Sequence, residues 1–176
     1  MPLLLLVLGA LGAGLFWYYR IRNAAEATRE ITEMASDVQS AARRFGFKRR
    51  ADIHPADAVD DARLVGAALA LVIAAHERII GADGHRRLSD ICRDAFDCTQ
   101  NEAEEIVVFA RWLEAQFSNR DEAARRLTRR LNLLARGDVL PDLERMVGAL
   151  APPGPDGYGE DTQAVLERSR RILRGG

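Results

Sequence analysis

The sequence has little of several components that would assign it to a particular protein class. Its 176 residues include only 2 Cys, 6 Pro and 14 Gly, and 6% of them are aromatic. Two cysteines exclude a disulfide scaffold, and the low proline and glycine content excludes a collagenous repeat or a low-complexity chain. Lysine is almost absent, because Lys48 is the only lysine among 25 basic residues. The remaining composition, 48% hydrophobic and 29% charged, is typical of a single folded domain.

The first twenty residues carry the strongest signal. No charged residue occurs from Pro2 to Tyr19, and a helix of about eighteen residues would cover roughly 27 Å of a bilayer. A cleaved secretory signal is the alternative, but it requires basic residues before the apolar run and small residues after it. An aromatic belt and a basic flank follow instead: Trp17, Tyr18, Tyr19, Arg20 and Arg22. We therefore expect residues 1–20 to anchor the chain in a bacterial cytoplasmic membrane by a single pass, with the C-terminal body in the cytoplasm.

Small residues four apart lie on one face of this predicted anchor. Gly9 is paired with Ala13, and Ala10 with Gly14. Such faces let two membrane helices approach closely, which favours docking to another membrane protein or to a second copy of the chain. Glycine and alanine are also common in membrane helices generally, so the pattern has a structural explanation as well.

Residues 21–50 are predicted to form an amphipathic stalk helix that ends in a basic joint, Lys48-Arg49-Arg50. An Ala-rich seam with heptad-like spacing allows two interpretations, a helix packed on its own domain or a dimeric coiled coil. The seam consists of Thr28, Ile31, Ala35, Val38, Ala42 and Phe45.

The body of the chain shows helical periodicity and no useful alternating β pattern, so the fold class is all-α. Residues 51–151 are expected to form a compact multi-helix domain, and residues 152–176 a Pro/Gly-rich loop and a final helix. One helix with a nearly all-apolar centre is predicted from about residue 55 to about residue 78, and Thr99 with Glu102 forms a capping-box signature. The helices predicted after it run approximately over 85–96, 99–117, 118–134, 141–150 and 160–173.

Catalytic signatures are scarce in this body. The sequence has no glycine-rich phosphate loop, zinc-spaced Cys pair or nucleophile elbow, so we expect a protein that is not an enzyme and has no resident cofactor. Cys92 and Cys98 are predicted to be buried thiols. One polar turn could converge on a divalent cation, although such turns are common without one. Its candidate ligands are Glu77, Asp83 and His85, beside His76.

A basic stripe is predicted on the helix that ends near residue 134. Arg125, Arg126, Arg129 and Arg130 form two adjacent pairs at four-residue spacing. Arginine suits bidentate capture of carboxylate or phosphate groups, so this stripe is a candidate partner-binding surface. We expect no nucleic-acid partner, because the chain beyond residue 50 is net acidic and no aromatic residues are interleaved with the stripe.

Four segments of the body follow one another in a distinctive order: the apolar segment Ala67–Ala75, the turn Ala82-Asp83-Gly84, the segment Ala95-Phe96-Asp97 and the Glu-rich start at 102–105. In this order of features, residues 64–134 resemble the tellurite-resistance TerB-like family. The resemblance implies a small all-helical module, of a kind also found beside the membrane anchor of a DnaJ-like co-chaperone. In the family, acidic residues implied to bind a metal follow the Asp-Gly turn, whereas His85, Arg86 and Arg87 occupy that place here. Asp83, in the turn itself, is therefore the one family position that the resemblance carries over.

Together these features predict a non-enzymatic, membrane-anchored protein-interaction module. A single-span accessory or assembly subunit of a larger inner-membrane complex, respiratory or photosynthetic for example, fits this description. Its partners would be that membrane complex, or a second copy through anchor and stalk, together with the lipid bilayer. The alternative, which the resemblance implies, is a TerB-like metal-binding stress-response protein.

Overall fold

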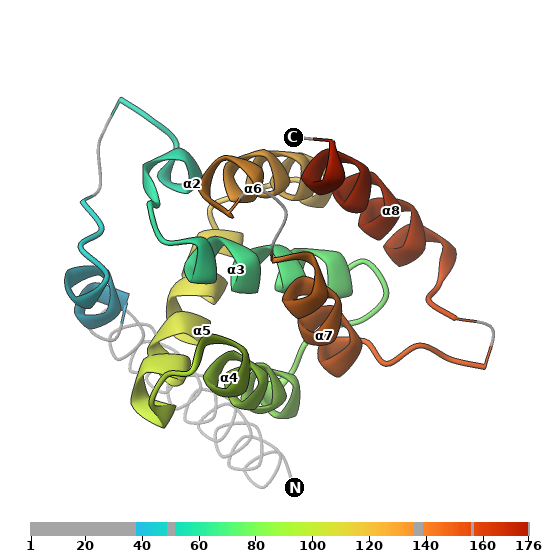
Figure 1. Ribbon diagram of the computed structural model, residues 1–176, viewed down its shortest axis with the longest axis horizontal. Helices are drawn as coiled ribbons and strands as arrows, with labels where there is room; N and C mark the ends of the chain where they lie inside the picture. The colour runs from blue at the N-terminus through green and yellow to red at the C-terminus, as the bar shows by residue number, and fades with distance from the viewer. Residues whose placement is uncertain (1–37, 49–51, 136–138, 156, 176) are drawn as a thin grey trace, which may run out of the picture. The chain divides into compact units, whose positions relative to one another are not determined.

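A computed structural model describes residues 38–48, 52–135, 139–155 and 157–175 of the chain. These residues belong to one compact unit, Val38–Gly176, and their fold is all-α, as predicted (Figure 1). Residues 38–44 are helical. The helices that follow are α2 (Pro55–Ala58), α3 (Ala62–Ala74), α4 (Ala82–Phe96), α5 (Gln100–Glu114), α6 (Arg120–Ala135), α7 (Leu140–Leu150) and α8 (Glu160–Arg174).

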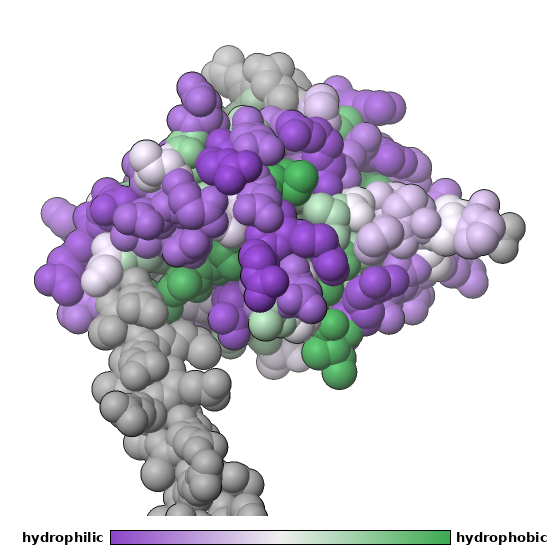
Figure 2. Space-filling model, turned by 90° about the horizontal axis from the view of Figure 1, so that it is seen from below, coloured by the Kyte–Doolittle hydropathy of each residue, from purple (hydrophilic) through white to green (hydrophobic). Residues whose placement is uncertain are grey.

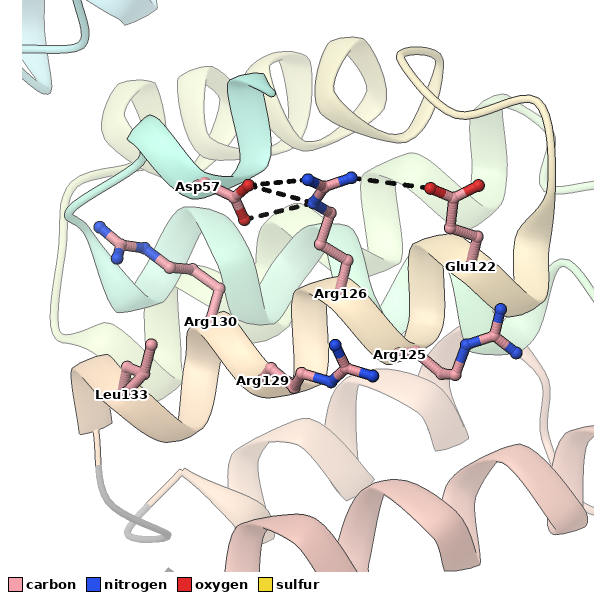
Figure 3. A pocket seen from close by; sticks show the side chains of 7 residues that line it. All are labelled: Asp57, Glu122, Arg125, Arg126, Arg129, Arg130 and Leu133. Atoms are coloured by element: carbon pink, nitrogen blue, oxygen red, sulfur yellow. Dashed lines mark hydrogen bonds and ion pairs between the residues drawn. The ribbon is translucent and has the colours of Figure 1, made fainter. Parts of the chain in front are cut away.

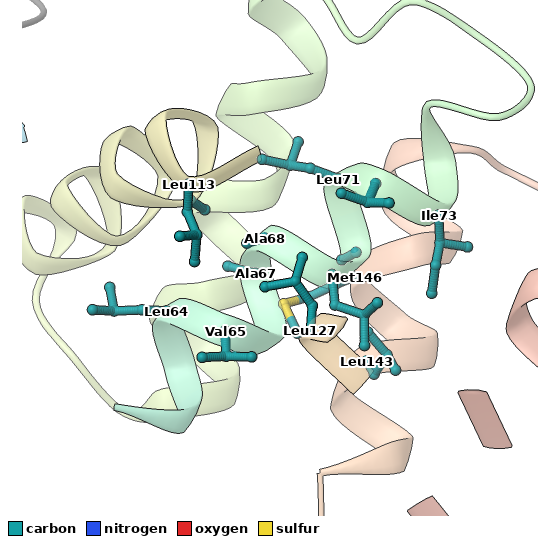
Figure 4. Close-up of a cluster of buried hydrophobic side chains, with 14 of the residues drawn as sticks. Leu64, Val65, Ala67, Ala68, Leu71, Ile73, Leu113, Leu127, Leu143 and Met146 are labelled. Atoms are coloured by element: carbon teal, nitrogen blue, oxygen red, sulfur yellow. The ribbon is translucent and has the colours of Figure 1, made fainter. Parts of the chain in front are cut away.

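Helix α3 lies at the centre of this unit. Every residue from Leu64 to Ala74 is buried, and the helix packs against α4, α5, α6, α7 and α8 (Figure 1). Leu113 of α5, Leu127 of α6 and Met146 of α7 lie in the same buried cluster (Figure 4). A helix that is apolar on all sides is stable only when other helices cover each side. The predicted burial of the apolar segment that begins at Leu64 is therefore confirmed.

The starts of α5 and α6 are capped by side chains close in sequence. The backbone N–H of Glu102 donates to Oγ1 of Thr99 at 3.3 Å, and the backbone N–H of Thr99 donates to Oε2 of Glu102 at 3.0 Å. This pair confirms the predicted capping box. The hydroxyl of Thr99 also donates to Oε2 of Glu102 at 2.9 Å, and the hydrogen bonds from the Thr99 N–H and hydroxyl lower the pKa of Glu102. At α6, the side chain of Asn119 accepts from the backbone N–H of Glu122 at 3.0 Å.

The prediction of one continuous helix over 55–78 is wrong. Helix α2 ends at Ala58, and the chain is extended at Val59 before α3 begins. Asp61 accounts for the restart, because its carboxylate accepts the backbone N–H of Arg63 at 2.9 Å as an N-cap. Helix α3 also ends earlier than expected, at Ala74.

The next helix begins at Ala82 rather than at His85, so Gly84 lies inside the first turn of α4. A Cβ atom at Gly84 would lie only 2.7 Å from Cγ2 of Ile80. The glycine thus permits close packing against the preceding turn.

The compact unit also extends beyond the predicted domain limits of 51 and 151. Ala41, before the predicted start, is fully buried, and Phe47 packs edge-on against Phe109 with ring centroids 5.2 Å apart. Beyond the predicted end, Val165 and Leu166 of α8 are buried, and α8 packs on α6 and α3. The described end of the predicted stalk and the C-terminal helix both belong to the same hydrophobic core as α3.

Among the described residues, no helix combines the length and the hydropathy needed to span a bilayer.

Cys92 is buried, Cys98 is half-buried, and both are free thiols. Burial raises the pKa of Cys92 to about 12. Figure 2 shows a largely hydrophilic face with separate apolar patches.

Candidate functional site

Helix α6 places the four predicted arginines on its outer side. Its inner side buries Ala123, Leu127 and Leu131 against the core. Four-residue spacing keeps side chains on one side of a helix, so the outer side carries a continuous basic surface. We call this surface the arginine face; it consists of Arg125, Arg126, Arg129 and Arg130.

Arg126 is held by two carboxylates. Its Nε donates to Oδ2 of Asp57 at 3.1 Å, and its Nη2 lies 3.0 Å from the same oxygen. Its Nη1 lies 3.6 Å from Oε1 of Glu122, one turn earlier on α6. Figure 3 shows the guanidinium group between the two acidic side chains. Arg126 therefore links α6 to α2.

Arg130 binds the segment between α2 and α3. Its Nε donates to the backbone carbonyl of Val59 at 2.8 Å, and its Nη2 lies 2.5 Å from Oδ1 of Asp60. Only 19% of its side chain is exposed. The carbonyl contact satisfies a backbone acceptor where the chain is extended between the two helices. Arg130 thus has a structural role.

Arg125 and Arg129 differ from these two residues. Both are exposed, and neither has an ion pair or side-chain hydrogen bond with any residue in the part of the chain that the structure describes. Leu133, one turn further along α6, is 72% exposed. We call Arg125, Arg129 and Leu133 the open stripe; Figure 3 shows it running along one side of the helix.

The open stripe borders a shallow pocket of about 540 Å³. Asp57 and Glu122 also line it, together with all four arginines of the arginine face. Because these two carboxylates already face Arg126, the two positive charges of the open stripe remain available to a ligand. Two planar guanidinium groups one helical turn apart can each hold a carboxylate or phosphate by paired hydrogen bonds.

A second hollow, of about 710 Å³, lies where α3, α5 and α6 meet. His76 lines it, with Nδ1 2.8 Å from the carbonyl oxygen of Val72 and Nε2 4.0 Å from Oδ1 of Asp121. Glu114 also lines the hollow, and burial raises the pKa of its carboxyl group. Its lining includes side chains of both charges, since Glu114 and Asp121 are acidic and Arg120 is basic.

The predicted metal ligands are engaged separately. Glu77 accepts the backbone N–H of Gly159, whereas Asp83 is exposed and lies 3.3 Å from Nη1 of Arg86. Burial and nearby Arg111 lower the pKa of His85. Over the described ranges, no three His, Cys, Asp or Glu side chains form a group that could hold a metal ion. The predicted convergence of Glu77, Asp83 and His85 is therefore not found in the fold.

The predicted membrane-helix residues lie outside the described residues. They are the packing positions Gly9, Ala10, Ala13 and Gly14 and the interface positions Trp17, Tyr18, Tyr19, Arg20 and Arg22.

Two features of the arginine face were missing from the sequence interpretation. Leu133 was not singled out, although its position four residues after Arg129 could have indicated it. Asp57 and Asp60 were not recognised as neighbours of the arginines either. Their partners, Arg126 and Arg130, are about seventy residues away in the sequence, and no local pattern connects them.

No protein-family model matches this chain, and comparisons with curated proteins and with solved structures likewise give no match. The TerB-like resemblance therefore stays a prediction from the sequence. Functional inference rests on the residues of the chain itself, above all on the arginine face.

Proposed function

We propose that this chain is a non-enzymatic, single-pass membrane protein whose helical domain binds a partner protein through the arginine face. A single-span accessory or assembly subunit of a larger inner-membrane complex fits this role. One observation carries the proposal: Arg125 and Arg129 are exposed and have no partner among the described residues, beside exposed Leu133 and a pocket. Neighbouring Arg126 and Arg130 contact Asp57, Val59 and Asp60 within the fold, whereas Arg125 and Arg129 contact no acidic or polar side chain among the residues that the structure describes.

The sequence of the first twenty residues supports the membrane part of the proposal. An uncharged segment from Pro2 to Tyr19, followed by Arg20 and Arg22, is typical of an anchor with its basic flank in the cytoplasm. A tethered domain meets membrane-bound partners at a high effective concentration, so a weak surface contact can suffice for assembly.

The test is affinity purification of the full-length chain in a mild uncharged detergent, followed by mass spectrometry. We expect R125E/R129E to lose a specific membrane partner. A matched control, R78E/R86E, changes the net charge equally but lies outside α6 and retains the partner. If the same proteins accompany all three forms, the arginine face is not the binding surface and the proposal fails.

A parallel experiment addresses the anchor. Carbonate extraction should leave the full-length chain in the membrane fraction. In addition, G9L/A13L should weaken co-purification, because leucine prevents close helix approach at these positions. V7L/L11I, on the opposite side of the predicted helix, is the matched control. Release of the chain by carbonate would contradict the membrane assignment.

A further inference from the structure

We infer that the open stripe binds an acidic amphipathic helix of the partner, with carboxylates at positions i and i+4 and an apolar residue at i+8. This inference rests on the proposed function and specifies the chemistry of the partner. Its starting point is the order of side chains along α6: two uncommitted arginines one turn apart, then an exposed leucine a further turn along.

The flanking charges favour discrete carboxylates over a densely charged surface. Asp57 and Glu122 line the same pocket, and Asp60 beside Arg130 is 89% exposed. A phospholipid or nucleic-acid surface would bring closely spaced phosphates against these three carboxylates, which would repel them. A helix carrying two carboxylates can place them on Arg125 and Arg129 while keeping other negative charge away.

The backbone of α6 favours a helical partner over an extended one. The central N–H and C=O groups of α6 are paired within the helix, so the stripe offers side chains but no strand edge. A helical segment satisfies its own backbone groups and needs only side-chain partners. Its i and i+4 side chains have the same spacing as Arg125 and Arg129, because both pairs follow the geometry of an α-helix.

Leu133 supplies the apolar end of the contact. It is 72% exposed and lines the pocket beside the arginines. Burying its side chain against a partner leucine, isoleucine or valine would be favourable by the hydrophobic effect. The ion pairs alone would not bury this apolar surface. The three contacts together also set the direction of the bound helix, since only one orientation places the apolar residue on Leu133.

The test uses a fluorescein-labelled, alanine-based peptide of about twenty residues, long enough to be helical in isolation. It carries Glu at i and i+4 and Leu at i+8. The full-length chain is held in uncharged detergent micelles, and binding is measured by fluorescence anisotropy at low salt. A permuted peptide of identical composition has its two Glu residues two positions apart, on nearly opposite sides of the helix.

We expect the designed peptide to bind at least tenfold more tightly than the permuted one, and raised salt to weaken binding. R125E/R129E should lose at least tenfold in affinity, whereas R78E/R86E stays within about twofold of the parent. A peptide with Lys in place of both Glu residues should prefer R125E/R129E over the parent. Circular dichroism confirms that each variant is folded.

Equal affinity for the designed and permuted peptides, no effect of R125E/R129E, or no binding at all would overturn the inference. So would Arg-dependent capture of phosphatidylglycerol vesicles, without peptide binding, by the chain in phosphatidylcholine nanodiscs. These failures are distinguishable from failure of the proposed function. If R125E/R129E still loses a co-purifying protein while no peptide binds, the interaction surface stands and only the helical acidic partner is wrong.

Discussion

Helices α3 and α6 belong to the same core but use their side chains in opposite ways. Every residue of α3 from Leu64 to Ala74 is buried, whereas α6 buries one side and exposes Arg125 and Arg129 on the other. Substitutions throughout α3 should therefore affect stability. Within α6, the inner side should affect stability, whereas the open stripe should affect binding alone.

The largest expected effect comes from making the same change in both helices. Leu71→Ala in α3 removes a fully buried side chain and should lower the free energy of unfolding by about 2–5 kcal/mol. Leu133→Ala in α6 should change it by less than about 0.5 kcal/mol, because the leucine is exposed. Urea unfolding followed by far-UV circular dichroism measures both. Similar losses for the two variants would contradict the comparison.

A pair of glycine substitutions examines how closely the core is packed. Gly84→Ala should destabilise by about 1–3 kcal/mol, because its Cβ would lie 2.7 Å from Cγ2 of Ile80. Gly66→Ala in α3 should instead stabilise by about 0.5–1 kcal/mol. Its Cβ would meet Cε of Met146 at 3.7 Å, an ordinary contact. Thermal unfolding of the two variants provides the measurement, and destabilisation by Gly66→Ala would mean that α3 has no spare space there.

Substitutions of the neighbouring residues Arg130 and Arg129 distinguish an arginine with a structural role from one expected to bind a partner. Arg130→Ala should cost about 1 kcal/mol, since it removes the hydrogen bond to the carbonyl of Val59 and the contact with Asp60. Arg129→Ala should cost less than about 0.5 kcal/mol. Chemical denaturation of the two single variants compares these losses directly. An equal loss for both would show that Arg129 also has a role inside the fold.

The smallest expected effect is a pH dependence at Glu114, in the hollow that α3 and α6 both line. Burial raises the pKa of Glu114, so its favourable contribution is present below the unfolded-state pKa and lost as pH rises through the folded-state pKa. Glu114→Gln should therefore be more stable than the parent near pH 8, by less than about 1 kcal/mol because the carboxyl group is partly solvated. Near pH 3 the parent and Glu114→Gln should have equal free energies of unfolding. A difference that did not change between these pH values would contradict the assignment.

Helices and their caps were largely predictable because they depend on residues close in sequence. The Thr99–Glu102 pair signalled the start of α5, and the apolar run after Leu64 signalled the core helix. The break at Val59 was missed, because proline at 55 and acids at 57, 60 and 61 suit one long helix start as well as two short ones. The packing function of Gly84 was also hidden, since only the folded chain brings Ile80 against it.

The candidate site was predictable only in part. Spacing alone placed four arginines on one helix side, but it could not tell that Arg126 and Arg130 are held by Asp57 and Asp60. Those pairs are distant in sequence and yet meet in the fold. By contrast, Glu77, Asp83 and His85 are close in sequence and yet form no group of ligands. Proximity along the chain does not determine the direction in which side chains point from a turn.

The sequence by itself determined that this chain folds into helices, which of them is buried on all sides, and that α6 carries a basic outer surface. Hydrophobic periodicity and capping depend on residues a few positions apart, so both can be recognised in the sequence without knowledge of the fold. Only the tertiary structure decided which of these arginines are held by other parts of the described fold. That division depends on carboxylates and a carbonyl about seventy residues away, which packing of α2 and its following segment against α6 brings within hydrogen-bond distance.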